Sequence, residues 1–243
     1  MSTLIYAHRG ASKQAPENTM PAFELGYKQG ADGIETDVQL TKDGIPVLIH
    51  DETVNRTTNG TGFIKDLTYQ ELSALDAGSW KSDTYSDTRI PTLDDLLAWN
   101  KEKNLKLNLE LKNNIISYPS IEKIVTEKLK DYNMVEQSVI SSFNHNSIAL
   151  LDSLNVEVDY ALLTSKRTSD LISYSKDIHA RGIHIRYRLL SNRFVTNAKQ
   201  NGLYVAVYTV NSPLSISKVL RLGCHAMFTD VPKRALEIKQ RNK

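Results

Sequence analysis

Short apolar runs, many rich in β-branched residues, alternate with longer amphipathic patterns along nearly the whole chain of 243 residues. The short runs predict β-strands and the longer patterns predict helices. Strands that alternate with helices in this way form a parallel sheet. We expect eight strand positions, the second of which includes a hairpin excursion over 46–50: 4–8, 33–38, 105–112, 138–143, 157–163, 182–187, 203–210 and 225–230.

Helical patterns fill the intervals between these runs. They cover residues 19–29, 92–103, 119–132, 145–154, 169–180, 192–201, 213–222 and 232–241. About eight strand–helix units in a chain of this length favour an α/β fold of the closed (β/α)8 type, a TIM barrel. Barrels of this size are usually one domain, so we expect a single domain over 1–243. A six-stranded open sheet is the structural alternative.

One segment, 51–91, interrupts the alternation. It contains "TTNGTG" and "KSDTYSDTRIP", which are typical of turns, and a short helix is predicted at 68–75. This segment is a small insertion after the second strand. An insertion at the carboxyl end of a barrel strand would lie over the mouth of the barrel, where active sites of such folds form.

Charge and composition exclude several classes of function. The net charge is +2 and the basic residues are spread along the chain, which does not indicate a nucleic-acid partner. No apolar run approaches the ~18 residues that span a bilayer, and no signal-peptide pattern is present, so we expect a cytoplasmic protein without stable membrane insertion. The single cysteine, Cys224, is expected in the core. The sequence leaves a homo-oligomer open.

Carboxylates lie near the ends of two neighbouring barrel strands. Glu35 and Asp37 are two residues apart in "GIETDV" and therefore point to the same face; Glu110 and Lys112 repeat this spacing in "NLELK". Adjacent strands are about 4.8 Å apart, so three carboxylates can surround one point. Oxygen ligands without cysteine favour a hard divalent cation, Mg²⁺ or Ca²⁺. A salt-bridged strand end is the alternative.

Two histidines end predicted strands on either side of this acidic pair in the sequence. His8 follows "LIYA", and His50 follows "PVLI". Imidazole is suited to proton transfer near neutral pH. Arg9 and Lys112 add fixed positive charge that suits a phosphate. A divalent metal, two cations and two histidines together favour cleavage of a phosphodiester.

The motifs that contain these residues resemble those of glycerophosphodiester phosphodiesterases. The resemblance extends from about residue 5 to residue 232. The motifs occur in the same order as in that family: "AHRG", "PENT", "GADGIETDVQLTKDGIPVLIHD", "NLELK", "ISSF", "YTVN" and "FTDVP". The resemblance implies a TIM barrel with a small insertion between the second strand and the second helix. It also implies metal-dependent hydrolysis of deacylated phospholipids, such as glycerophosphocholine and glycerophosphoethanolamine, to sn-glycerol 3-phosphate and an alcohol.

The resemblance also assigns roles. His8 and His50 match the catalytic acid/base pair. The sequence does not decide which of the two is the acid and which is the base. It also leaves open whether water or the substrate's own 2-hydroxyl attacks the phosphorus. Metal ligands correspond to Glu35, Asp37 and Glu110, phosphate contacts to Arg9 and Lys112, and a bracing carboxylate to Glu17. The family's "WTVN" is here "YTVN", so Tyr208 and Phe143 are either an aromatic wall of the substrate pocket or ordinary core residues.

Some alternatives stay open at this point. Related barrels act on lysophospholipids or phosphoinositides, although no basic amphipathic helix for a membrane surface is evident. A barrel that only binds a glycerophosphate is a second alternative. Arg186 and Arg188 either meet an anionic head group or are solvated, and we favour solvation. The remaining histidines are expected to be structural or on the surface: His145, His179, His184 and His225.

Overall fold

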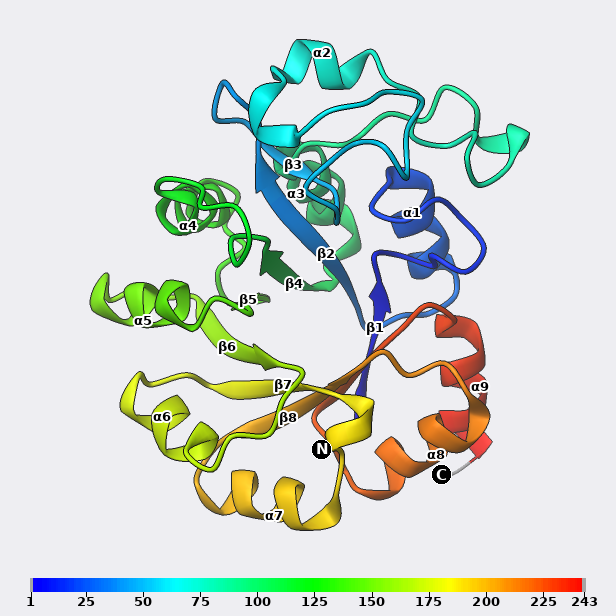
Figure 1. Ribbon diagram of the computed structural model, residues 1–243. Helices are drawn as coiled ribbons and strands as arrows, with labels where there is room; N and C mark the ends of the chain where they lie inside the picture. Colours follow the sequence, from blue (N-terminus) through cyan, green and yellow to red (C-terminus); the bar gives the residue numbers. More distant parts are fainter. Residues whose placement is uncertain (1, 242–243) are drawn as a thin grey trace.

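The computed structural model describes residues 2–241. Met1, Asn242 and Lys243 of the predicted domain 1–243 therefore lie outside the described residues. Eight parallel strands form a closed barrel, because β1 pairs with both β9 and β2. The predicted TIM barrel is confirmed and the open sheet is excluded (Figure 1). The parallel strands are β1 (Leu4–His8), β2 (Gly33–Leu40), β4 (Lys106–Leu111), β5 (Ser138–Ser142), β6 (Asp159–Thr164), β7 (Gly182–Arg186), β8 (Tyr204–Tyr208) and β9 (Ala226–Thr229).

The hairpin excursion is β3 (Pro46–Leu48), which pairs antiparallel with β2. The prediction that a strand continues to His50 is wrong. The buried side-chain amide of Gln39 donates hydrogen bonds to the carbonyls of Ile49, His50 and Asp51 at 2.9, 3.2 and 2.7 Å. The Gln39 side chain thus supplies the hydrogen bonds that these carbonyls would otherwise accept from the backbone of a paired strand. His50 therefore lies in a loop.

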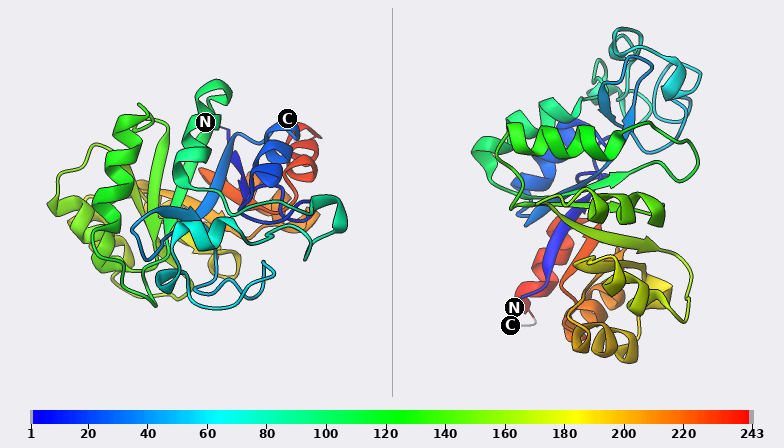
Figure 2. Two further views of the ribbon diagram at one scale, coloured as in Figure 1. Left: turned by 90° about the horizontal axis from the view of Figure 1, so that it is seen from above. Right: turned by 90° about the vertical axis from the view of Figure 1, so that its left-hand side faces the viewer.

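Within residues 2–241, eight helices lie around the strands, as Figures 1 and 2 illustrate. Several begin where the sequence supplies a capping side chain: Thr92, Ser191 and Ser212 each accept a hydrogen bond from a backbone N–H of the helix that follows. The helices are α1 (Met20–Lys28), α3 (Leu93–Lys103), α4 (Ile121–Asp131), α5 (His145–Ser153), α6 (Leu171–Asp177), α7 (Asn192–Gln200), α8 (Pro213–Arg221) and α9 (Pro232–Arg241).

The insertion, residues 51–91, contains α2 (Tyr69–Ser73) and two single-turn 3₁₀ helices, Ile64–Asp66 and Asp83–Tyr85. It projects at one side of the barrel (cyan in Figure 1; Figure 2). Apolar side chains of the insertion form a small core together with Val47 of β3 and Ile49. Lys81 connects the insertion to the β1–α1 loop through a 2.8 Å hydrogen bond to the Ser12 carbonyl. The single-domain organisation and the insertion's position over the mouth stay predictions.

Aromatic rings pack against one another in the barrel interior toward its amino end. Tyr6 and Phe228 have ring centroids 5.4 Å apart, and His184 lies 5.1 Å from Phe228. These side chains are buried, as is Cys224, which confirms the expectation of a core cysteine. Active sites of this fold form at the other end of the barrel, at the carboxyl ends of the strands.

Among residues 2–241, no helix combines the length and the apolar character that crossing a membrane requires.

Candidate active site

Strand register assembles the polar cluster at the carboxyl end of the barrel. His8 of β1 is opposite Glu35 of β2, and Asp37 of β2 is opposite Glu110 of β4. The side chains therefore meet because of the register between neighbouring parallel strands. A carboxylate oxygen from each of Glu35, Asp37 and Glu110 lies within 4.8 Å of the others.

Two cations contact this cluster. Arg9 Nε lies 3.3 Å from Asp37 Oδ2, and Lys112 Nζ lies 3.0 Å from Glu110 Oε1 and 3.8 Å from Asp37 Oδ1. Arg9 Nη1 also donates to Glu17 Oε1 at 2.9 Å. Glu17 thus contacts the same guanidinium that contacts Asp37.

Local backbone geometry explains the "HRG" motif. Arg9 has φ 57°, a left-handed conformation that costs a non-glycine residue about 1 kcal/mol. Its backbone N–H donates to Glu35 Oε2 at 2.9 Å, which holds the residue in place. Gly10 has φ +81°, and a Cβ there would lie 2.5 Å from the Ala22 carbonyl carbon. Only glycine therefore allows α1 to approach the end of β1 this closely.

The positive charges of Arg9 and Lys112 do not fully balance the negative charges of the three carboxylates. Burial, reinforced by the charges of Asp37 and Glu110, raises the pKa of Glu35 to about 8. Burial also raises the pKa of Glu110. Burial acts on Asp37 in the same direction, but Arg9 and Lys112 outweigh it and lower the pKa of Asp37 to about 2. Buried carboxylate oxygens with excess negative charge are a donor set that fits a hard divalent cation.

His8 is held by a carboxylate from the last strand. Its Nδ1 lies 2.7 Å from Asp230 Oδ1, while its Nε2 lies 3.9 Å from Glu35 Oε2. Asp230 also accepts hydrogen bonds from Asn211 at 2.6 Å and Ser12 at 3.2 Å. Burial lowers the pKa of His8, but Glu35 and Asp230 outweigh it and raise the pKa above its usual value. One ring nitrogen is thus fixed, and the other faces the carboxylate cluster.

His50 is held in a similar way by residues of the loop and the insertion. His50 Nδ1 lies 2.7 Å from Asp51 Oδ1. Arg56 donates to Asp51 through Nε at 2.7 Å and to Glu17 through Nη1 and Nη2 at 2.9 and 2.8 Å. Arg56 is therefore a bridge that connects the support of His50 with that of Arg9.

Asn18 lies just before α1, but its side chain contacts the carboxylate cluster and does not cap the helix. Thr19 occupies the capping position of α1 without a side-chain hydrogen bond. Asn18 has φ 55°, donates through Nδ2 to Asp37 Oδ2 at 2.9 Å and accepts from Thr36 Oγ1 at 2.7 Å. The "PENT" motif thus sends its asparagine side chain into the barrel, where it stabilises the Asp37 carboxylate.

A cavity of about 750 Å³ opens at this end of the barrel. The rings of Phe143 and Tyr208 pack edge to face on its wall, with centroids 5.9 Å apart, and the Tyr208 hydroxyl donates to the Thr164 carbonyl at 2.8 Å. Arg186 and Arg188 are exposed, as expected, but they also line the cavity. The lining residues are His8, Arg9, His50, Glu110, Phe143, Arg186, Tyr187, Arg188, Tyr208 and Thr209.

All ten residues that the sequence analysis assigned to the site lie at this end of the barrel. Four further polar residues were not identified as part of it: Asn18, Asp51, Arg56 and Asp230. For Asp230 a signal was present, because "FTDVP" ends the last strand and a closed barrel places that strand beside β1. For Arg56 no periodic pattern exists in the irregular insertion.

Comparison with known proteins gives consistent matches over nearly the whole chain. A model of the glycerophosphoryl diester phosphodiesterase family matches residues 8–234. A glycerophosphodiester phosphodiesterase of Caldanaerobacter subterraneus subsp. tengcongensis is 38% identical over 238 residues, which cover 98% of each chain. One from Bacillus altitudinis is 40% identical over 244 residues, covering 99% of this chain and 100% of the relative. The solved structure of an Oleispira antarctica phosphodiesterase in complex with the product sn-glycerol-3-phosphate has a TM-score of 0.88 at 31% identity, covering 98% of this chain and 97% of that one.

Proposed function

The chain belongs to the glycerophosphoryl diester phosphodiesterase family and is a phosphoric diester hydrolase, and we propose that it hydrolyses deacylated phospholipids in a metal-dependent reaction. Glycerophosphocholine and glycerophosphoethanolamine are representative substrates, and the products are sn-glycerol 3-phosphate and an alcohol. The observation that supports this most strongly is one cavity lined by both predicted histidines, beside a cluster of three carboxylates of which Glu35 and Asp37 are buried.

Glu35, Asp37 and Glu110 would hold one divalent cation, Mg²⁺ or Ca²⁺. Such a cation stabilises negative charge on the phosphoryl oxygens and lowers the pKa of an attacking hydroxyl. The proposal is supported by the mutual distances of the three carboxylates and by the charge excess that raises the pKa of Glu35.

His8 and His50 would act as the acid/base pair. One takes the proton of the attacking hydroxyl, and the other gives a proton to the leaving alkoxide as the phosphorus–oxygen bond breaks. Each imidazole has a carboxylate at 2.7 Å from Nδ1, Asp230 in one case and Asp51 in the other. This contact fixes the ring orientation and leaves Nε2 available for proton transfer.

Arg9 and Lys112 would contact the phosphate, with Glu17 holding Arg9 in position. Both cations are already paired with carboxylates of the cluster, so their side chains are pre-oriented before substrate binds. Phe143 and Tyr208 would form an apolar wall against the glycerol carbons.

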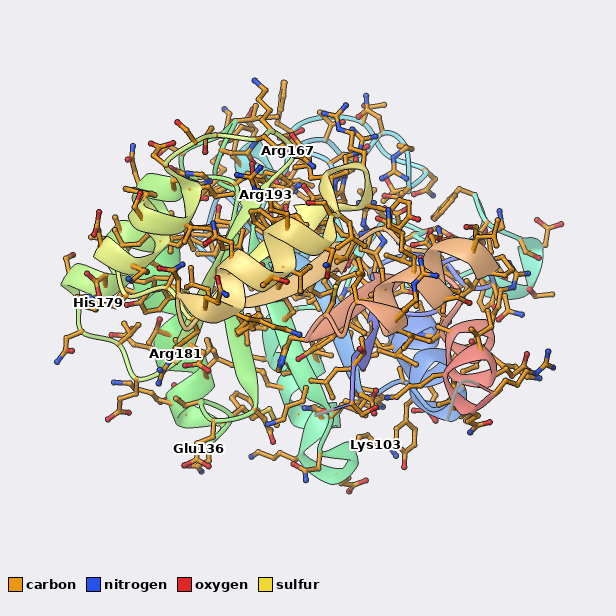
Figure 3. All side chains as sticks on the ribbon, turned by 90° about the horizontal axis from the view of Figure 1, so that it is seen from below. Lys103, Glu136, Arg167, His179, Arg181 and Arg193 are labelled. Carbon is orange, nitrogen blue, oxygen red and sulfur yellow. The ribbon has the colours of Figure 1, made fainter. Side chains whose placement is uncertain are left out.

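The test is release of glycerol 3-phosphate from glycerophosphocholine and glycerophosphoethanolamine, followed with a coupled dehydrogenase. EDTA should abolish release, and Mg²⁺ or Ca²⁺ should restore it. His8→Ala and His50→Ala should each lower kcat by about 10²–10⁴-fold. His179→Ala is the matched control, because that exposed histidine (labelled in Figure 3) contacts Asp152, and neither residue lines the cavity. Activity that persists in EDTA, or in the two variants, would contradict the proposal.

We also propose that the enzyme works in the cytoplasm and that residues 51–91 border the mouth of the barrel. The single, buried cysteine supports a reducing compartment. The contacts of Arg56 with Glu17 and Asp51 support the position of the insertion.

A further inference from the structure

One continuous stretch of the barrel is strongly basic. Residues 178–229 contain no Asp or Glu, whereas they contain Arg181, Arg186, Arg188, Arg193, Lys199, Lys218 and Arg221. Since the whole chain has a net charge of only +2, the rest of the chain carries an excess of acidic residues. The stretch runs from β7 through α8 into β9, so the positive charge gathers on one side of the barrel (yellow to orange in Figure 1).

Two of these arginines face the candidate active site. Arg186 is the last residue of β7, Arg188 follows in the 3₁₀ turn Tyr187–Leu189, and both line the cavity that contains His8 and His50. Burial raises the pKa of the Tyr208 hydroxyl, and the charges of Arg186 and Arg188 act against that rise. Arg186 is opposite Tyr208 in the register of β7 and β8, and both arginines line the cavity together with Tyr208, so they border its aromatic wall.

Neither arginine is neutralised by a carboxylate. Within residues 2–241, no ion pair involves Arg186 or Arg188, and Arg188 donates only to the Ser165 carbonyl, at 2.9 Å. Arg9 differs, because Glu17 and Asp37 both contact it. Arg186 and Arg188 are thus free cations beside the cavity, and they are available to a charged ligand.

The charge of the cavity wall determines which leaving alcohol it favours. Among the described residues that line the cavity, Glu110 is the one carboxylate, and it is paired with Lys112 at 3.0 Å. A cationic alcohol such as choline would therefore meet two guanidiniums and no free carboxylate. A phosphate group suits two guanidiniums, because their planar donor pairs match its oxygens.

We propose that Arg186 and Arg188 form a subsite for a second phosphate group, carried by the leaving alcohol of the glycerophosphodiester. This inference rests on the proposed function and adds the class of substrate: diesters with a phosphorylated leaving alcohol are preferred over those with a neutral or cationic one. The two arginines determine specificity, and the bond that breaks is the same phosphorus–oxygen bond in every substrate.

Three substrates that all release glycerol 3-phosphate test this inference: glycerophosphoinositol, glycerophosphoinositol 4-phosphate and glycerophosphocholine. The wild-type ratio of kcat/KM for the phosphorylated to the unphosphorylated inositol diester should be about tenfold. Arg186→Gln and Arg188→Gln should each lower this ratio by about threefold to fivefold, since exposed charge pairs contribute modestly. The double variant should bring the ratio close to one. The ratio is the readout, so differences in the reactivity of the two alcohols cancel between variants.

Arg181→Gln is the matched control. Arg181 directly precedes β7, at the opposite end of the strand that ends in Arg186, and it lines a separate cavity together with Glu136 (Figure 3). Its replacement should leave the ratio unchanged. Raising the ionic strength from 0.1 to 1 M shortens the Debye length from about 10 to 3 Å and should lower the wild-type ratio without any substitution.

The possible outcomes separate this inference from the proposed function. Hydrolysis of glycerophosphoinositol with a wild-type ratio of one or less would overturn the phosphate subsite and leave the proposed function intact. A high ratio that survives in the double variant would also overturn it. No hydrolysis of any of the three substrates, with either metal, would overturn both proposals.

Discussion

Replacing Glu35 with Gln should stabilise the metal-free protein at pH 8 and should abolish its stabilisation by a divalent cation. Glu35 is 4% exposed and lies within 4.8 Å of two further carboxylates. Glutamine has nearly the same volume, and its side-chain oxygen can still accept the hydrogen bond that the Arg9 N–H gives to Glu35. The substitution therefore removes charge with little change in packing.

The size of the effect follows from the pKa of Glu35. Burial, with Asp37 and Glu110, raises it from 4.5 to about 8. Between these values the folded protein keeps a proton that the unfolded chain has released, so the folded state is favoured at low pH and loses this advantage as the pH rises. The slope is about 1.4 kcal/mol per pH unit for one group. The free energy of unfolding of the metal-free protein should thus fall by about 2–3 kcal/mol from pH 6 to pH 8.

Urea unfolding at pH 6 and pH 8, in EDTA and then in excess Mg²⁺ or Ca²⁺, measures this difference. The wild type should lose stability with pH in EDTA and regain it with the cation, whereas Glu35→Gln should show a smaller loss and no response to the cation. Glu122→Gln changes a buried glutamate outside the cluster and should keep the response. Two results would refute the argument that the buried charge of Glu35 destabilises the metal-free protein. One is a metal-free wild type that gains stability from pH 6 to pH 8. The other is a Gln variant that is less stable than the wild type at pH 8.

Three further substitutions test the supports of the site. Asp230→Asn should lower kcat by about 10²-fold or more, because His8 loses the carboxylate that fixes its tautomer. If the variant unfolds at the same urea concentration as the wild type, the loss of activity is not caused by a loss of stability. Asn18→Ala should destabilise the protein by about 1–3 kcal/mol in urea unfolding, since the buried Asp37 carboxylate loses a donor. Arg56→Ala should change the free energy of unfolding by less than about 1 kcal/mol, because Arg56 is 44% exposed, yet steady-state kinetics should show kcat/KM lowered about tenfold.

Residues on regular strands could be placed in the site from sequence alone. Glu35 and Asp37 share a face because side chains alternate along a strand, and β4 follows β2 in the sheet, so Glu110 and Asp37 end up opposite each other. Such placement needs only local periodicity and the order of the strands. The same reasoning predicted the barrel, since eight alternating units have few other ways to bury both faces of a parallel sheet.

Residues whose role depends on closure or on irregular backbone were missed. Asp230 reaches His8 only because the last strand pairs with the first, a contact between residues 222 positions apart. Asn18 is placed by a left-handed backbone conformation, which no periodic pattern encodes. Arg56 lies in a loop of the insertion, where neither strand nor helix periodicity applies. These contacts are set by tertiary structure, and a single sequence does not reveal them.

The two histidines of the site depend on different parts of the fold. His8 is 17% exposed and is held by Asp230, so its support comes from the closed barrel itself. His50 is 31% exposed and is held by Asp51, whose other partner is the half-exposed Arg56 of the insertion. A change in the conformation of the insertion would therefore alter the orientation of His50 and, through Glu17, that of Arg9, while His8 stays fixed. The proposed acid–base roles require both imidazoles within hydrogen-bond reach of the substrate. Under that proposal, the insertion is a part of the chain through which the rate of proton transfer can vary without loss of the barrel.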